Sequence, residues 1–532
     1  MDIAACRRAT PSVISNHTAQ LAARAPRPNT LATSSLLGHF PRRTLPAMNR
    51  FTLVKSTWVL VFALVGICAP PHCGAAGPAE DFGTVVRQFS AVRHKTEETL
   101  AKKLALPITK EAQEFFEAAK TGDAVAVSNL FQKLLSPGPP PAPRPEYRNE
   151  LWAPIHETLG LYEVWVDWKK NSALLNSFTH PVMVSLPAGS IYFGGTDHGR
   201  FLITAVTDIQ NPAPIYCITQ NALADTTYMD YLRTIYGKQL WIPSKQDSQR
   251  AFQEFVRAWQ DRRARGIPLE DGDGVEIAQG QVQVRGVKAV MNINAILCHY
   301  IHDHNKDAHA FYVEESYVLD WMYPALEPHG LIMKLNKAPL ANLSEEIIAK
   351  DRRFWSERTE SLLTQPGFAD NRPAQLAFAK MRSAIAGLYA FRQLDDEAEL
   401  AFRQALQLCP VSPEANLSLA KLLERRGQVD RATELLKKFI PQAPLSAVGE
   451  AQAQLKALEN QRPLTPAERQ LLTGLVHQLG APQFTERSAA RQQLADFGPR
   501  ALPLLREQAN NKDPEISLTI GKLIRQLSPQ RQ

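Results

Sequence analysis

The chain has 532 residues, with 60 Lys and Arg against 53 Asp and Glu, and a formal net charge of +7. This length is more than one hydrophobic core normally spans, so about three domains are expected. Residues 1–47 hold six Arg against one Asp, and residues 48–76 add one Arg and one Lys, so the chain is neutral from residue 77 onward. The composition therefore argues against a generally basic nucleic-acid-binding protein, and no nucleic-acid partner is expected.

The first 76 residues have the sequence of a leader. Residues 1–47 show no helical or strand period, so we expect them to be disordered or to precede the true start at Met48. Residues 48–76 combine a positive start at Arg50 and Lys55, an apolar run over 57–69 and the small residues 74–76. This is the pattern of a secretory signal peptide and predicts export to the periplasm or cell envelope. Membrane association is expected only if this segment stays uncleaved.

Residues 77–135 form the next predicted region. Two amphipathic helical patterns, 110–120 and 123–135, meet at Thr121 and Gly122 and predict a helical hairpin. Residues 136–146 are dominated by proline, which excludes helix and predicts an extended linker. An aromatic-rich helix follows the linker and is expected to pack against a neighbouring domain.

Residues 147–345 are predicted to form an α/β domain. Short apolar strands at 191–193 and 215–219 each end in a polar turn and are each followed by a helix. Further strands are expected at 240–242, 311–313 and 331–333, with a helix over 318–326 and a hairpin over 275–284. This alternation predicts a mostly parallel, Rossmann-like sheet whose ligand lies at the carboxyl ends of the strands.

Six polar residues near those strand ends are candidate ligand-binding residues. Helix amides together with an arginine can hold an anion, and a carboxylate or amide can bind a sugar hydroxyl. Helix capping is the structural alternative for the residues that follow the two turns. The candidates are Asp197, His198, Arg200, Asn221, Asp225 and Glu314.

Histidine and cysteine residues offer no firm metal site. The spacing of His299, His302, His304 and His309 matches no structural zinc pattern, so a solvated helix end is expected. Beyond residue 76 the cysteines are Cys217, Cys298 and Cys409, which are expected to be buried thiols, although a bridge between the first two stays open. No cofactor is predicted.

Several short motifs of this region resemble a known family. They are Gly-Gly-Thr-Asp at 194–197, Pro-Ile-Tyr at 214–216, Asn-Ala-Leu at 221–223, Phe-Tyr-Val at 311–313 and the run 326–335. Residues 186–337 thereby resemble the extracytoplasmic α/β domain of a bacterial membrane family related to GT-C glycosyltransferases of the protein O-mannosyltransferase kind. The membrane helices of that family, which carry its catalytic acid, have no counterpart here. The resemblance therefore implies no catalytic residue.

The C-terminal region shows a repeat. Ala386, Ala398, Phe402 and Ala405 are each followed 34 residues later by Ala420, Ala432, Leu436 and Phe439. This is the tetratricopeptide period, so residues 374–460 are predicted to form such repeats after a connecting helix at 346–373. Residues 461–532 resemble a HEAT-like repeat and would extend an all-α solenoid.

These features favour an exported, non-catalytic protein with two binding parts. The α/β domain would bind a glycan or another polar ligand, and the helical repeats would bind a protein partner. The alternatives are an enzyme or accessory subunit that acts on glycans, and a protein in which only the repeats are functional.

Overall fold

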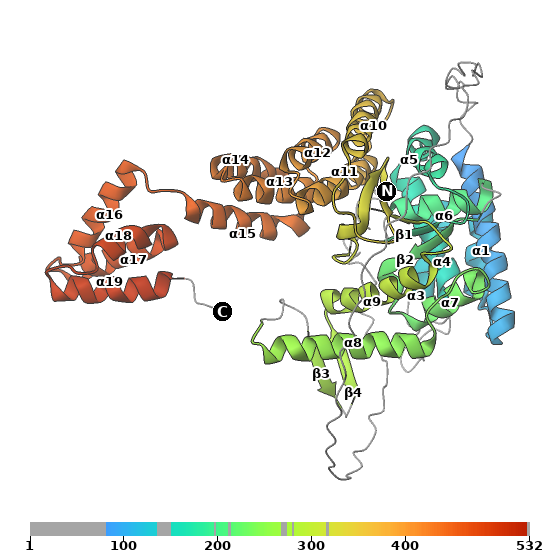
Figure 1. Cartoon of the computed structure of the whole chain (residues 1–532), viewed down its shortest axis with the longest axis horizontal. Coiled ribbons are helices and arrows are strands. Elements are labelled where there is room, and N and C mark those ends of the chain that lie inside the picture. The colour runs from blue at the N-terminus through green and yellow to red at the C-terminus, as the bar shows by residue number, and fades with distance from the viewer. Residues whose placement is uncertain are drawn as a thin grey trace, which may run out of the picture.

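A computed structural model describes residues 81–135, 151–195, 198–210, 214–267, 274–278, 281–314 and 319–528 (Figure 1). The predicted disordered start of residues 1–47, the predicted signal peptide of residues 48–76, the predicted linker of residues 136–146 and Asp197 lie outside these residues. Buried apolar side chains form two clusters, one running from Phe82 to Leu458 and one from Leu472 to Leu523. The described chain therefore has a main body and a separate C-terminal helical module.

In the described part of the chain, five helices precede the sheet. They are α1 (Phe82–Leu104), α2 (Lys110–Thr121), α3 (Ala124–Leu135), α4 (Trp152–Asp167) and α5 (Ser172–Ser185). The α2–α3 hairpin confirms the predicted pair of helices, and Gly122 ends α2 with a φ of 86°, a conformation that favours glycine. The long helix α1 packs on α2, α4 and α6 at the edge of the main body (Figure 1).

The sheet is small and mixed. Its strands are β1 (Ile191–Gly194), β2 (Tyr216–Thr219), β5 (Phe311–Val313), β6 (Leu326–His329) and β7 (Ile332–Leu335). They lie in the order β2-β1-β5-β7-β6. The first three are parallel, whereas β7 pairs antiparallel with both β5 and β6.

Helices and a second, two-stranded sheet connect these strands. The segment between β1 and β2 is α6 (His198–Gln210), and the segment between β2 and β5 contains α7 (Thr226–Tyr236), α8 (Lys245–Ala264) and α9 (Val287–Asn305). The antiparallel pair β3 (Gly274–Ala278) and β4 (Gln281–Arg285) lies between α8 and α9 and confirms the predicted hairpin. Short 3-10 turns, η3 (Gln220–Ala222) and η4 (Tyr323–Ala325), complete the region.

The predicted Rossmann-like α/β domain is wrong. The described chain is mostly helical, and its five-stranded sheet has strands of three or four residues and only three parallel members. The predicted strand at 240–242 does not pair with another strand, because the side-chain amide of Asn305 bonds both the N–H and the C=O of Trp241 at 2.9 Å. The predicted helix at 318–326 is instead η4 followed by β6, which forms an antiparallel hairpin with β7.

Seven helical segments continue the main body. They are α10 (Glu345–Thr364), α11 (Arg372–Phe391), α12 (Asp395–Leu408), α13 (Pro413–Arg425), α14 (Val429–Phe439), η5 (Ile440–Gln442) and α15 (Leu445–Gln461). Helices α11 and α12 pack as one pair and α13 and α14 as the next, with the equivalent residues Ala386 and Ala420 both buried. This arrangement is compatible with the expected helical solenoid, while its assignment to the tetratricopeptide family stays a prediction.

Helix α11 joins these helices to the rest of the main body. The Phe378 ring lies 5.5 Å from that of Phe178 and 6.0 Å from that of Trp168, both in the N-terminal part. At the other end of α11, the Arg392 guanidinium donates to the carbonyl oxygens of Pro324 at 2.9 Å and of Leu326 at 3.2 Å. The sheet and the helices α10 to α15 therefore share one core.

The C-terminal module consists of α16 (Pro466–Gln478), α17 (Phe484–Asp496), η6 (Gly498–Ala501), α18 (Leu502–Glu507) and α19 (Pro514–Leu527). Thr465 and Glu468 form the capping box that the sequence predicts at the start of α16. Figure 1 shows this module beyond the end of α15, away from the sheet. None of the described helices is both long enough and apolar enough to span a bilayer.

Candidate functional site

The carboxyl ends of the three parallel strands meet, as the sequence predicts. Gly194 at the end of β1 pairs with Thr219 at the end of β2. On the other side, the backbone N–H of Glu314, which follows β5, donates to the carbonyl of Phe193 at 2.8 Å. His198 is the first residue of α6. The end of β1 thus lies between the ends of β2 and β5.

Arg200 faces the protein interior. It is 3% exposed, and its Nη1 donates to Oε1 of Glu157 in α4 at 2.9 Å. The other oxygen of Glu157 lies 2.6 Å from Nε of Arg93 in α1 and accepts a bond from the Tyr231 hydroxyl of α7 at 2.8 Å. Arg93 also pairs with Asp208 of α6 at 2.6 Å. We call this set of five side chains the Glu157 network.

The network compensates the charges it buries. Burial opposes ionisation of the Glu157 carboxyl, but Arg93 and Arg200 outweigh this effect and hold its pKa below the usual range. Burial likewise raises the pKa of the Tyr231 hydroxyl, so this group stays a hydrogen-bond donor. Because one carboxylate binds side chains from α1, α6 and α7, the network fixes three helices to α4.

Glu314 occupies the space at the start of α6. Its side chain is fully buried, and a Cβ added to Gly199 would lie 1.7 Å from its Oε1. A Cβ added to Gly194 would lie 2.6 Å from its Oε2 and 2.6 Å from Cγ of Arg200. Helix N-termini attract anions, and here the protein's own carboxylate takes the place that the sequence suggested for a ligand anion.

The other predicted residues support local structure. The carbonyl of Asn221 accepts from Nδ2 of Asn294 at 2.8 Å, and Asp225 caps α7 by accepting from the N–H of Thr227 at 2.8 Å. Asn294 also accepts from the N–H of Ala224 at 2.6 Å, so it fixes the turn after β2. The structure therefore brings Arg200 and Glu314 together around Gly194 and buries both of them, whereas Asp225 is an exposed helix cap.

The described cysteines and histidines add no reactive cluster. Cys217, Cys298 and Cys409 are buried free thiols, so the open alternative of a bridge between the first two is not realised. Burial lowers the pKa of His302 to about 4. No group of three potential metal ligands occurs among the residues that the structure describes.

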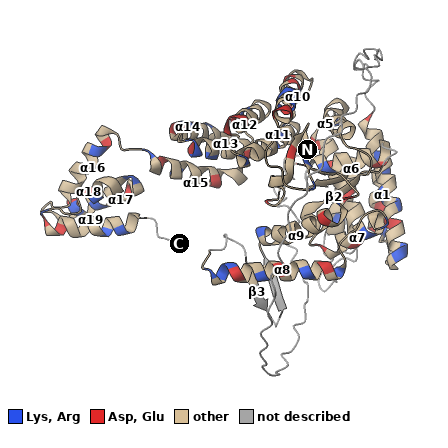
Figure 2. Ribbon diagram, in the orientation of Figure 1, with Lys and Arg blue, Asp and Glu red and all other residues tan. Residues whose placement is uncertain are grey.

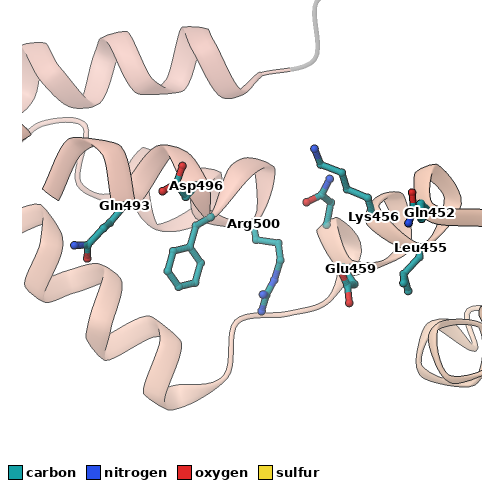
Figure 3. Close-up of a pocket in the computed structure, with 9 residues that line it drawn as sticks. Gln452, Leu455, Lys456, Glu459, Gln493, Asp496 and Arg500 are labelled. Carbon is teal, nitrogen blue, oxygen red and sulfur yellow. The ribbon is translucent and has the colours of Figure 1, made fainter. Parts of the chain in front are cut away.

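A groove of about 660 Å³ lies where the main body meets the C-terminal module (Figure 3). One wall belongs to α15 and the other to α17 and η6, and both walls carry apolar and charged side chains. The lining residues of α15 are Gln452, Leu455, Lys456, Glu459 and Asn460, and those of the other wall are Gln493, Asp496, Phe497 and Arg500.

Three amides in this groove are available to a ligand. Within the described part of the chain, the side-chain amides of Gln452, Asn460 and Gln493 form no hydrogen bond. Each amide carries both a donor and an acceptor, which is the hydrogen-bonding pattern of a peptide backbone. Leu455 and Phe497 add apolar surface beside them. The groove therefore presents hydrogen-bond donors, acceptors and apolar surface side by side.

The charges of the groove differ in how they are compensated. Glu459 pairs with Lys437 at 2.9 Å, and Arg500 pairs with Glu468 at 2.6 Å. Arg500 also donates to the carbonyl of Arg462 at 3.3 Å, so it holds η6 against the segment that joins α15 to α16. Its hydrogen bond lowers the pKa of Glu468 to about 2. Lys456, in contrast, forms no ion pair among the described residues.

Sequence reasoning missed both the Glu157 network and the groove. For the network a signal existed, since Arg93 lies on the same helical stripe as the apolar residues Phe89 and Leu100. No sequence signal pointed to the groove, because its two walls come from helices whose relative position the sequence does not specify.

No family model, curated protein or solved structure matches this chain.

Proposed function

We propose that this chain is an exported, non-catalytic platform that binds an extended segment of a partner protein in the groove between α15 and α17–η6. The observation that supports this proposal most directly is that the groove is lined by three side-chain amides beside apolar surface. These are the amides of Gln452, Asn460 and Gln493. Helical repeat proteins bind extended segments on such surfaces. Export rests on the sequence of residues 48–76 alone.

A polar ligand at the carboxyl ends of the strands has less support. Arg200 and Glu314 are buried, where Arg200 pairs with Glu157 and Glu314 fills the start of α6, and Asp225 is engaged as the cap of α7. A glycan-directed enzyme would need such groups to face a cleft. We therefore place the partner at the groove and not at the sheet.

The test compares two variants of the intact chain. Gln452→Arg places a long cation in the groove, whereas Ala453→Arg introduces the same side chain at the next position of α15, which is exposed and does not line the groove. Each tagged protein is used to capture partners from an envelope extract of the source organism, and the captured proteins are quantified by mass spectrometry.

We expect at least one protein that is captured by the unmodified chain and by Ala453→Arg but is depleted about tenfold with Gln452→Arg. Such a loss corresponds to about 1.4 kcal/mol of binding free energy, which is typical of disrupting a contact near the centre of an interface. Identical sets of captured proteins for the two variants would refute the proposal.

A further inference from the structure

The C-terminal module is joined to the main body by a link of three residues, Arg462, Pro463 and Leu464. Arg462 contacts the main body, where it pairs with Asp430 of α14 at 3.1 Å, whereas Leu464 packs against the hydrophobic cluster of the module. Pro463 lies between them, and the residue before a proline is disfavoured in a helical conformation. Arg462 accordingly has a φ of −68° and a ψ of 135°, so α15 ends there and does not continue into α16 as one rigid helix.

No hydrophobic cluster of the described chain spans the two sides of the groove. Leu455 of α15 packs against the main-body cluster and Phe497 packs against the module cluster, so these two side chains belong to different cores. At one point of contact, a Cβ added to Gly498 of η6 would lie 3.6 Å from Oδ1 of Asn460. Figure 2 shows both signs of charge on α15 and on the module, so neither carries a field of one sign that would attract the other.

One side chain supplies the polar contacts that reach back from the module. Arg500 of η6 donates from Nε to the carbonyl of Arg462 at 3.3 Å and from Nη2 to the carbonyl of Pro463 at 3.4 Å. The same Nη2 pairs with Glu468 of α16 at 2.6 Å, and Figure 3 shows the guanidinium beside the link. Among the residues that the structure describes, no other hydrogen bond or ion pair joins the module to the link or to the main body.

We propose that the module moves about a hinge at residues 462–464 and that Arg500 fixes it in the position that forms the groove. Hinges are typically a few residues between rigid elements, and these residues absorb the change in backbone angles. When Arg500 releases the two carbonyls, α17 and η6 move away from α15 and the groove widens. The open position admits an extended polypeptide, and the closed position brings both walls into contact with it. This last step rests on the proposed function, whereas the movement itself requires no partner.

The test measures distances between spin labels in the full chain by pulsed electron paramagnetic resonance. One pair of labels is placed at Ser446 in α15 and Ser488 in α17, which are exposed and do not line the groove. A second pair, at Ser488 and the exposed Lys522 in α19, lies within the module and reports whether the module stays folded. The labels are attached to a genetically encoded keto amino acid, so that the native cysteines stay unlabelled.

The variants differ in which contact of the module they remove. Arg500→Ala removes the contacts with the link. The control Arg469→Ala removes another arginine of the module, whose ion pair with Glu507 lies within the module. Both substitutions remove the same side chain and the same charge, so only the position of the arginine distinguishes them.

We expect one narrow distribution of distances between positions 446 and 488 in the unmodified chain and in Arg469→Ala. Arg500→Ala should raise the population of longer distances about tenfold, as expected for the loss of hydrogen bonds from a charged group. The distance between positions 488 and 522 should stay the same.

Three results would overturn the proposal. The first is a distribution between positions 446 and 488 that Arg500→Ala leaves unchanged or that Arg469→Ala broadens equally. The second is a broad distribution in the unmodified chain, because Arg500 would then not fix the module. The third is a changed distance between positions 488 and 522 in Arg500→Ala, because Arg500 would then maintain the fold of the module instead of its position.

Discussion

Position 199 requires glycine because the Glu314 carboxylate fills the space that a side chain would need. We predict that Gly199→Ala lowers the free energy of unfolding by about 1–3 kcal/mol, since a buried carboxylate would have to move. The control is Gly449→Ala in α15, where an added Cβ meets nothing within 4 Å. That substitution should be neutral or stabilise by up to about 1 kcal/mol. Urea denaturation checks both values, and an equal effect of the two substitutions would contradict the assignment.

Glu97 in α1 should make stability depend on pH. Its side chain is fully buried, neither oxygen has a hydrogen-bond partner in the described chain, and burial raises its pKa from 4.5 to about 8. Between these values the folded state binds one proton more than the unfolded state. Stability should therefore fall by about 1.4 kcal/mol for each pH unit as the pH rises through this range, and level off above it.

The variant Glu97→Gln keeps the shape of the side chain but cannot ionise. We predict that it removes this slope and is more stable than the unmodified chain at pH 8, while the two are alike near pH 4. The control Glu111→Gln changes an exposed carboxylate in α2 and should keep the slope. Denaturation curves across this pH range decide the question, and an unchanged slope in Glu97→Gln would show that Glu97 is not the group responsible.

Among the helices, the Glu157 network is the contact on which the packing of α1, α4, α6 and α7 depends. Glu157→Ala would leave Arg93 and Arg200 buried without their shared carboxylate, so we predict a loss of about 3–5 kcal/mol. Glu450→Ala removes one partner of an exposed ion pair with Lys421 and should cost less than about 1 kcal/mol. Comparable losses in thermal unfolding for these variants would contradict the role of the network.

Helix periodicity and capping signals predicted many elements correctly, because they depend on neighbouring residues. The α2–α3 hairpin, the cap at Asp225 and the capping box at Thr465 follow from such local patterns. The prediction of a Rossmann-like sheet was wrong, because local patterns do not determine which strands pair. The antiparallel pairing of β7 with β5 and β6 is set by contacts between strands. The succession of β1 and α6 was predicted correctly, but the burial of Arg200 depends on Glu157 in α4, which lies 43 residues earlier.

At the scale of the whole molecule, the two hydrophobic cores should unfold separately. Leu472 is fully buried in the C-terminal module and Phe378 is fully buried in the main body. We predict that Leu472→Ala shifts only one calorimetric transition and Phe378→Ala only the other, with losses of about 2–5 kcal/mol each. A single transition that both substitutions shift would mean that the module and the main body form one cooperative unit.

The groove lies between these two units, so its partner should contact both walls at once. A photo-crosslinking amino acid placed at Gln452 in α15 or at Gln493 in α17 tests this directly in the full chain, with Ala453 as the exposed control position. We predict crosslinks from both groove positions to one stretch of the same partner protein and none from position 453. Crosslinks of equal yield at position 453, or none from either groove position, would contradict the proposal that this protein is a platform for a polypeptide ligand.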